Sequence, residues 1–284
     1  MNYRHAYHAG NFADVMKHAS LALIINYLKL KEKPFFILDT HAGTGSTDLS
    51  GIEAQKTGEY RDGIARILAA DKPHALLIPY LETLAQLGCE GAEPKLYPGS
   101  PMIAATLARP QDRLAFCELH PEDYASLRAR FRRDERVKVY EMDGYGALKS
   151  MLPPKERRGL ILIDPPFEQR SEFERILQEI EHIHVRFATG TVMIWYPIKD
   201  PSVSGAFVEH LEHKGPEKTL RAELFIRASD DPTRMSGAGL IIINPPWQLD
   251  EQLTSLFGWL KDILAQGTGA ERKGAAARVE WLKK

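Results

Sequence analysis

The stretch GLILIDPPFE, from Gly159 to Glu168, decides the fold class. Its four consecutive apolar residues, 160–163, are typical of a strand buried on both faces, as in parallel sheets that are flanked by helices. The strand must end at Asp164, because the two prolines that follow lack an N–H donor and hold the backbone extended. We therefore expect a stiff loop at the end of a central parallel strand.

This loop would present three kinds of group together: the Asp164 carboxylate, the Pro165 carbonyl and the Phe167 ring. Open α/β sheets bind their ligands at the carboxyl ends of the strands. A carboxylate, a carbonyl and a ring suit a flat heterocycle with an amino group, since the oxygens accept its N–H hydrogens. Asp-Pro-Pro also occurs as an ordinary loop terminator, so the motif alone does not decide the function.

The overall composition restricts the class of protein only broadly. The chain has 284 residues and a formal net charge of −1, so nucleic acid could be attracted only by local patches. No apolar run approaches membrane-spanning length, which predicts a protein without a membrane partner. Cys89 and Cys117 offer neither a disulfide framework nor zinc-type spacing, which fits a reducing cytoplasm. His5, His8 and His18 have no cysteine or carboxylate cluster beside them, and no metal is expected.

A second apolar segment, 34–38, leads into the glycine-rich turn DTHAGTG at 39–45. An apolar strand followed by such a turn is typical of Rossmann-like folds that bring backbone close to a nucleotide cofactor. The turn departs from the dinucleotide fingerprint, because Asp48 stands where the third glycine should be. A nicotinamide-dependent dehydrogenase is therefore the weaker alternative.

The segment between the first two strands predicts an insertion. Helical periodicity over 58–70 and 75–87 places a small helical subdomain at about 49–95, within one domain that spans 1–284. The apolar residues of an earlier helix, expected over 11–30, fall on one broad face, which predicts that the helix packs against the rest of the domain. The tail before this helix could fold over a site as a lid.

Polar residues follow the next strands in turn. Ser100 precedes Pro101, which predicts that Ser100 caps a helix and stands beside the cofactor crevice. Glu118 ends a strand over 113–117, where such folds bind ribose hydroxyls. Asp143 ends a strand over 137–141 and could accept from the amino group of an adenine ring. The basic run between these strands suits either a solvated helix face or phosphate contacts, and comprises Arg128, Arg130, Arg132, Arg133, Arg136 and Lys138.

A second motif, NPPW at 244–247, is by sequence as good an amine-binding loop as the first. Strands over 191–196, 219–227 and 239–243 complete the predicted sheet, the last two as an antiparallel pair. An antiparallel strand points its end away from the cofactor edge. We therefore expect the loop that begins at Asn244 to resemble the Asp164 loop in sequence without binding an amine. The tail from Gly267 is expected to be flexible before a short ending near 279–282.

Taken in order, the motifs resemble the RlmJ family of class I S-adenosylmethionine-dependent methyltransferases nearly end to end. The segments that carry the resemblance are YRHAYHAGNFADVMKH at 3–18, LDTHAGTG at 38–45, TGEYRDGIARI at 57–67, YPGSP at 97–101, ELHP at 118–121, RRGLILIDPPFE at 157–168 and INPPW at 243–247. The resemblance implies a Rossmann-like α/β sheet, mostly parallel with an antiparallel final strand.

The resemblance also implies an activity: transfer of a methyl group from S-adenosyl-L-methionine to the N6 amino group of an adenine in 23S ribosomal RNA. It implies cofactor contacts by His18, His41, Ser100, Glu118, Asp143, Gly144 and Asp164. It makes Asp164 catalytic and places Tyr3, Pro165 and Phe167 at the substrate, the base being swung out of its helix. Phe167 departs from the tyrosine of many relatives, which keeps the stacking surface and removes a hydroxyl.

Two alternatives remain open on sequence grounds. The chain could be an RNA-binding ribosome assembly factor that keeps the fold without catalysis, or an adenine-N6 methyltransferase acting on DNA. No obligate protein partner is evident.

Overall fold

The computed structural model describes residues 5–169, 171–229, 231 and 233–284, and within them eight strands make one mixed sheet in the order β10-β8-β9-β7-β6-β1-β4-β5. These strands are β1 (Phe36–Asp39), β4 (Arg113–Glu118), β5 (Val137–Glu141), β6 (Gly159–Ile163), β7 (Thr191–Ile198), β8 (Thr219–Phe225), β9 (Gly237–Ile243) and β10 (Ala276–Lys283). Strands β5, β4, β1, β6 and β7 pair in parallel, whereas β9 pairs antiparallel with both β7 and β8. The predicted fold class, a mostly parallel Rossmann-like α/β sheet, is confirmed.

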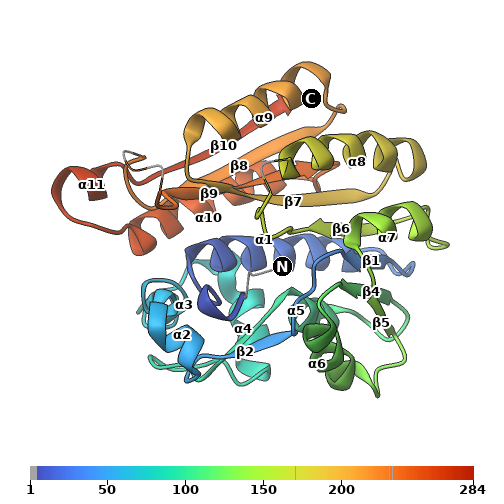
Figure 1. Cartoon of the computed structure of the whole chain (residues 1–284), viewed down its shortest axis with the longest axis horizontal. Helices are drawn as coiled ribbons and strands as arrows, with labels where there is room; N and C mark the ends of the chain where they lie inside the picture. The colour runs from blue at the N-terminus through green and yellow to red at the C-terminus, as the bar shows by residue number, and fades with distance from the viewer. Residues whose placement is uncertain (1–4, 170, 230, 232) are drawn as a thin grey trace.

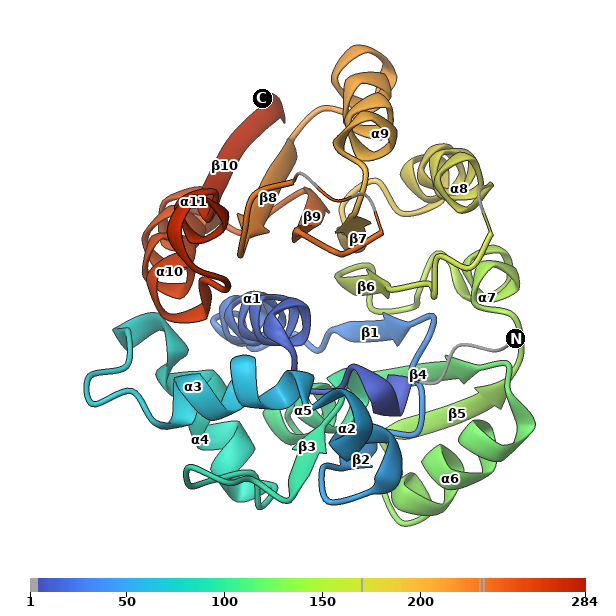
Figure 2. The same ribbon diagram turned by 60° about the vertical axis from the view of Figure 1, so that its left-hand side comes forward.

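Helices cover both faces of the sheet (Figures 1 and 2). The α-helices are α1 (Phe12–Lys29), α2 (Ile52–Thr57), α3 (Ile64–Leu68), α4 (Ile78–Gln86), α5 (Ser100–Leu107), α6 (Pro121–Phe131), α7 (Gly144–Met151), α8 (Glu172–Arg186), α9 (Pro201–Lys214), α10 (Leu249–Leu264) and α11 (Gly269–Lys273), and the 3-10 helices are η1 (His5–Tyr7), η2 (Glu59–Asp62) and η3 (Ala75–Leu77). The side chains of β6 alternate between two hydrophobic clusters, Leu160 and Leu162 in one and Ile161 and Ile163 in the other. This explains why the strand is apolar at every position.

Helix α1 lies across the middle of the molecule and is buried on nearly all sides. It contacts α4, α5 and α10 as well as β6 and β9. Asn11 begins the helix by accepting hydrogen bonds from the backbone N–H groups of Ala13 and Asp14. Its polar residues Asp14, Lys17 and His18 are all at most 4% exposed, so the sequence expectation of simple packing on one broad face was incomplete. Buried charges need partners, and these are found at the edge of the sheet.

The direction of each strand determines which loops meet. Strands β1, β4, β6 and β7 are mutually parallel, so the loops that follow Asp39, Glu118 and Asp164 leave the same edge of the sheet. Strand β9 runs the other way, with Ile243 paired to Val192 near the start of β7. The loop that begins at Asn244 therefore lies at the opposite edge.

Two parts of the chain differ from expectation. The tail from Gly267 is not an extended flexible segment, because α11 and the edge strand β10 follow, and β10 pairs with β8 along its length. The segment expected to be an insertion contains α2, α3 and α4, but it is also bounded by a two-stranded sheet of β2 (Ser46–Asp48) and β3 (Leu96–Pro98) that the sequence did not suggest. Its status as a subdomain of a single 1–284 domain stays a prediction.

Candidate active site

A cavity of about 1360 Å³ opens at the carboxyl edge of the sheet. It collects residues from α1, the glycine-rich turn and the ends of β4, β6 and β7. The predicted site residues that line it are His18, His41, Ser100, Glu118, Asp143, Gly144, Asp164, Pro165 and Phe167. Tyr3, the remaining predicted contact, lies outside the described residues. The sheet thus brings together side chains that are far apart in sequence.

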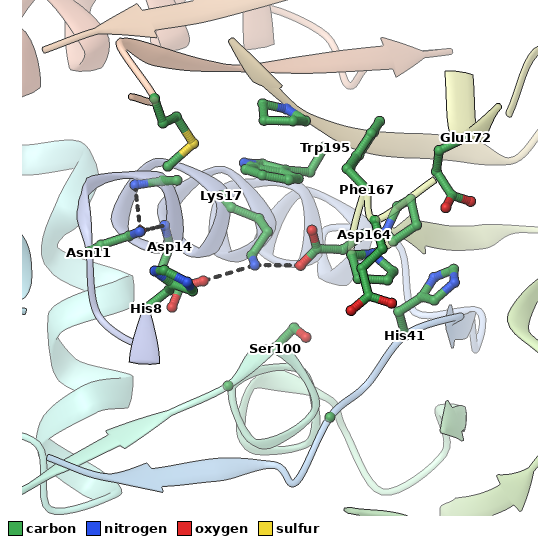
Figure 3. Close-up of a pocket in the computed structure, with 18 of the residues that line it drawn as sticks. His8, Asn11, Asp14, Lys17, His41, Ser100, Asp164, Phe167, Glu172 and Trp195 are labelled. Carbon is green, nitrogen blue, oxygen red and sulfur yellow. Dashed lines mark hydrogen bonds and ion pairs between the residues drawn. The ribbon is translucent and has the colours of Figure 1, made fainter. Parts of the chain in front are cut away.

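Asp164 is held by a charge that the sequence analysis missed. Lys17 Nζ donates to Asp164 Oδ2 at 2.5 Å and also pairs with Asp14 Oδ1 at 2.9 Å (Figure 3). Asp14 in turn accepts from the backbone N–H of Gly10. Burial alone would lower the pKa of Lys17, but the two carboxylates outweigh it and raise that pKa above its usual value. Lys17 is therefore a permanent cation that fixes the Asp164 side chain.

The spacing of Asp14, Lys17 and His18 was a signal that this face of the helix has partners elsewhere in the chain, although it does not indicate which carboxylate Lys17 meets. Positions i, i+3 and i+4 share one face of a helix, and a charged cluster on that face of a largely apolar helix needs partners outside the helix. His18 Nδ1 lies 2.8 Å from the hydroxyl of Tyr97, and the His18 ring stacks on the Tyr97 ring with centroids 5.6 Å apart. His18 thus lines the cavity with a fixed orientation.

The loop after Asp164 presents an aromatic surface. Phe167 has φ +49°, the left-handed region that non-glycine residues rarely adopt. Its ring meets Trp195 of β7 edge to face at 5.7 Å and lies 4.9 Å from the ring of Phe173. The strained backbone and the flanking rings together set the position of Phe167 beside the Asp164 carboxylate.

The glycine-rich turn and Glu118 are joined directly. The backbone N–H of Gly43 donates to Glu118 Oε2 at 2.9 Å, and that of His120 donates to Oε1 at 2.7 Å. Burial raises the pKa of Glu118, and these backbone hydrogen bonds oppose the shift. Gly43 has φ +60°, and a Cβ built on it would touch nothing within 4 Å. The turn therefore has an open face toward the cavity, with a carboxylate at its side.

Asp143 and Gly144 begin helix α7 at the cavity wall. Asp143 caps the helix by accepting from the N–H of Gly146, and its carboxylate pairs with Arg175 at 2.8 Å. A Cβ on Gly144 would lie 2.2 Å from the carbonyl oxygen of Thr40. Only glycine allows α7 to approach the end of β1 so closely, which brings Asp143 next to the glycine-rich turn.

His41 is a neutral imidazole in this arrangement. Burial lowers its pKa to about 4, and its Nδ1 lies 2.8 Å from Thr40 Oγ1. The ring meets Tyr145 edge to face at 5.4 Å. A neutral ring among aromatic and polar neighbours suits contact with an uncharged heterocycle.

Ser100 plays a different local role from the one predicted. Gly99, not Ser100, is the N-cap of α5, and no side chain caps this helix. The Ser100 hydroxyl instead donates to Asp39 Oδ2 at 2.6 Å. The prediction of a capping serine was wrong because a helix that starts one residue earlier leaves the hydroxyl free to reach β1. Asp39, another residue that the sequence analysis passed over, is 1% exposed, and burial raises its pKa to about 7.

Asn244 and two members of the basic run, Arg130 and Arg136, make structural contacts. Asn244 Nδ2 donates to the carbonyl oxygens of Ala188 and Gly190, away from the cavity. In the basic run, Arg136 bonds to Asp134 and to backbone oxygens, and Arg130 bonds to a backbone oxygen of the glycine-rich turn. No member of the run is among the described residues that line the cavity.

Neither a metal cluster nor a membrane-spanning helix occurs in the described part of the chain. Among residues 5–169, 171–229, 231 and 233–284, no group of three or more His, Cys, Asp or Glu residues could hold a metal ion. No helix in these ranges is both long and apolar enough to cross a bilayer.

Comparison with known proteins agrees with the resemblance seen in the sequence. The family model described as ribosomal RNA large subunit methyltransferase D, RlmJ, matches residues 32–282. Proteins named ribosomal RNA large subunit methyltransferase J from Haemophilus influenzae and Escherichia coli are each 43% identical over 283 residues, which is 99% of this chain and 99% of theirs. A crystal structure of LPL1258 from Legionella pneumophila superposes with a TM-score of 0.87 at 33% identity, covering 96% of this chain and 98% of that one. The chain is therefore a methyltransferase and belongs to the RlmJ family.

Proposed function

We propose that this protein transfers a methyl group from S-adenosyl-L-methionine to the N6 amino group of an adenine in 23S ribosomal RNA. One observation carries the proposal: the ion-paired Asp164, the Pro165 carbonyl and the Phe167 ring line the same cavity as the glycine-rich turn, Glu118 and Asp143. A site for an exocyclic amine therefore shares one cavity with a site for a nucleoside. Membership of the RlmJ family adds to this, since both relatives are named for methylating the ribosomal RNA of the large subunit.

The residues present fit the cofactor. Glu118 offers a carboxylate for ribose hydroxyls, and Asp143 offers one for an adenine amino group, at the ends of neighbouring strands. The open face of Gly43 leaves room for a ligand beside the turn, and the neutral His41 supplies an uncharged ring. When bound there, S-adenosylmethionine would supply an electrophilic methyl group on its sulfonium.

Asp164 would orient the substrate amine. The lone pair of adenine N6 is delocalised into the ring, so the nitrogen is a poor nucleophile. Hydrogen bonds from N6 to a carboxylate oxygen and to the Pro165 carbonyl favour a more pyramidal nitrogen and aim its lone pair. Lys17 occupies Oδ2 of Asp164, while no described residue donates a hydrogen bond to Oδ1. Asp164 therefore has an oxygen to offer without breaking its ion pair.

Phe167 would receive the base. Enzymes that modify a base in a nucleic acid take it out of the stack, and base-aromatic stacking offsets about 1–3 kcal/mol of that cost. The ring is already held by Phe173 and Trp195, so little side-chain entropy is lost on binding. We propose that the enzyme acts in the cytoplasm, where ribosomal RNA is found.

The alternatives are less well supported. A non-catalytic assembly factor has no need of an ion-paired carboxylate beside an amine-binding loop, and the family match favours an enzyme. DNA as the substrate is the second candidate, because an adenine amino group is the same in both nucleic acids.

A methyl-transfer assay with matched variants tests the proposal. Purified protein is incubated with tritiated S-adenosylmethionine and with 23S ribosomal RNA, or with DNA as the competing substrate, and the labelled nucleoside is identified by digestion. We expect N6-methyladenosine in the RNA. Asp164→Ala should lower the rate by at least about 100-fold while calorimetry still detects cofactor binding.

The second proline motif supplies the control. Asn244→Ala changes the first residue of an equivalent motif at the other edge of the sheet, so methyl transfer should be retained. An Asp164→Ala variant with undiminished rate, or an equal loss in Asn244→Ala, would refute the assignment.

A further inference from the structure

The cavity continues beyond Phe167 toward the ends of β7 and β8, and this part has no role in the proposed chemistry. It is lined by Trp195, Lys199, Arg227 and Arg234. Lys199 comes directly after β7, and the backbone N–H of Ser236 donates to the carbonyl oxygen of Ile198. That bond brings the segment with Arg234 alongside the segment with Lys199.

The two arginines share one acidic partner. Arg234 Nη1 lies 3.4 Å and Arg227 Nη1 lies 3.9 Å from the same oxygen, Oε1 of Glu271 on α11. Helix α11 and the loop after β8 lie at the same end of the sheet (Figure 1), joined by a hydrogen bond from the Ala228 N–H to the Glu271 carbonyl. Two guanidinium groups are thus gathered around a single carboxylate.

The Arg227 side chain is only partly satisfied by its neighbours: its Nη2 donates to Gln266 Oε1. Arg227 Nε is buried and has no hydrogen-bond partner among the described residues. Burial and the charge of Arg234 lower the pKa of Arg227, and the carboxylates of Glu271, Glu59 and Asp62 oppose this shift without cancelling it. Asp200, one of the acidic side chains that line the cavity, is engaged in capping α9 through Ser202. The two arginines therefore keep donor capacity beyond the single carboxylate oxygen of Glu271 that they share.

We propose that Arg227 and Arg234, with Lys199 beside them, bind a phosphodiester of the RNA strand next to the flipped adenosine. This inference rests on the proposed function, and it adds the contact that positions the strand. Arginine suits the role, because its planar fork of donors matches a phosphate. The site lies along the cavity from Asp164, with the edge-to-face contact between Phe167 and Trp195 linking the two. When the base is held at Asp164, the sugar-phosphate backbone of the RNA next to it would lie at the two arginines.

Equilibrium binding of a short single-stranded oligoribonucleotide with a central adenosine tests the site directly. Affinity is measured by fluorescence anisotropy over a range of salt concentrations, for the full chain and for Arg234→Gln and Arg227→Gln. Each variant should bind about 10- to 100-fold more weakly. The slope of log affinity against log salt should fall by about 0.7 for each phosphate that the variant no longer neutralises. Because the Arg234 side chain is 57% exposed, its variant should fold normally even if Arg227→Gln does not.

Two controls separate this site from general electrostatics. Arg186→Gln removes the same charge from an exposed position at the end of α8, outside the cavity, and should leave affinity nearly unchanged. Glu271→Gln removes the competing carboxylate, so RNA affinity should rise. If the arginines only stabilised α11 through Glu271, that variant would show no gain.

A neutral methylphosphonate at either linkage flanking the adenosine locates the phosphate that the arginines bind. The intact protein should lose affinity when one of these linkages is neutral, and Arg234→Gln should lose less. Equal losses in both proteins, or none in the intact protein, would overturn the inference. A loss of S-adenosylmethionine binding in the variants would also overturn it, because the arginines would then hold the cofactor. Since binding is the readout, the result stands whether or not methyl transfer is observed, and absent transfer would count against the proposed function alone.

Discussion

The buried carboxyl group of Asp39 should make the stability of the protein depend on pH. Asp39 ends β1 and is 1% exposed. It accepts hydrogen bonds from the Ser100 hydroxyl at 2.6 Å and from the backbone N–H of His41 at 3.2 Å. Burial raises its pKa from 3.8 to about 7, the Ser100 hydrogen bond opposes this, and the negative charge of Asp164 adds to it. The folded protein therefore holds a proton at pH values where the unfolded chain has lost it.

The sign and size of the effect follow from this difference. Between about pH 4 and pH 7 the folded state binds more protons than the unfolded state, so the free energy of unfolding falls as the pH rises. The slope is about 1.4 kcal/mol per pH unit, and the full shift corresponds to about 4 kcal/mol. Below pH 4 and above pH 7 this group adds no further dependence. Asp39→Asn, which resembles the protonated form, should lack this slope.

Urea denaturation of both proteins from pH 5 to pH 9 measures the prediction. The stability of Asp39→Asn relative to the original protein should increase up to about pH 7 and then stay constant. The exposed carboxylate of Asp71 provides a control, since Asp71→Asn should give a difference that hardly changes with pH. A constant difference between Asp39→Asn and the original protein across the range would refute the reasoning.

Two further predictions concern the buried ion pair and the central strand. Lys17→Met removes the buried cation that Asp14 and Asp164 share, so the free energy of unfolding in urea should fall by about 3–5 kcal/mol and tritium transfer to RNA should fall. The double variant with Lys17→Met and Asp14→Asn should recover part of the stability but not the methyl transfer. Recovery of both would contradict a role for Lys17 in fixing Asp164. Gly159→Ala should destabilise the protein by about 3 kcal/mol, because a Cβ there would lie 1.9 Å from a backbone oxygen of β1. Gly205→Ala, in an open position of α9, should instead stabilise it by up to about 1 kcal/mol, and similar melting temperatures for the two variants would disprove this.

The parallel strands were predictable because their signal is local. Strands β1, β4 and β6 are each based on a short buried apolar run that ends at or just before a carboxylate residue, and burial on both faces leaves few other structures for such a run. The strand β6 was expected over 160–163 and spans Gly159–Ile163. Candidate residues at strand ends were accessible by the same reasoning, because parallel strands bring their carboxyl ends to one edge.

The contacts made by α1 were not predictable in this way. Lys17 meets Asp164 across 147 positions of sequence, and nothing local indicates which carboxylate a buried lysine will reach. Strand β10 was not predicted over its full length for a different reason. Its apolar residues Ala277, Val279 and Trp281 recur at every second position, as in a half-buried strand, but they are small or few and lie in a segment rich in glycine and charge. Pairing with β8 and contact of Trp281 with Asp250 of α10 supply the missing stabilisation.

The two proline motifs show why composition alone does not define an amine-binding loop. Both follow buried strands and both place an aromatic residue fourth, yet the left-handed residue is Phe167 in the first and Asn244 in the second. In the first, the carboxylate faces a cavity and a cation. In the second, the side-chain amide of Asn244 donates to two backbone carbonyl oxygens, and Trp247 is 76% exposed. Strand direction separates them, because β6 runs with its parallel neighbours and β9 against them. A motif at a strand end therefore acquires its chemistry from the edge of the sheet on which that end lies.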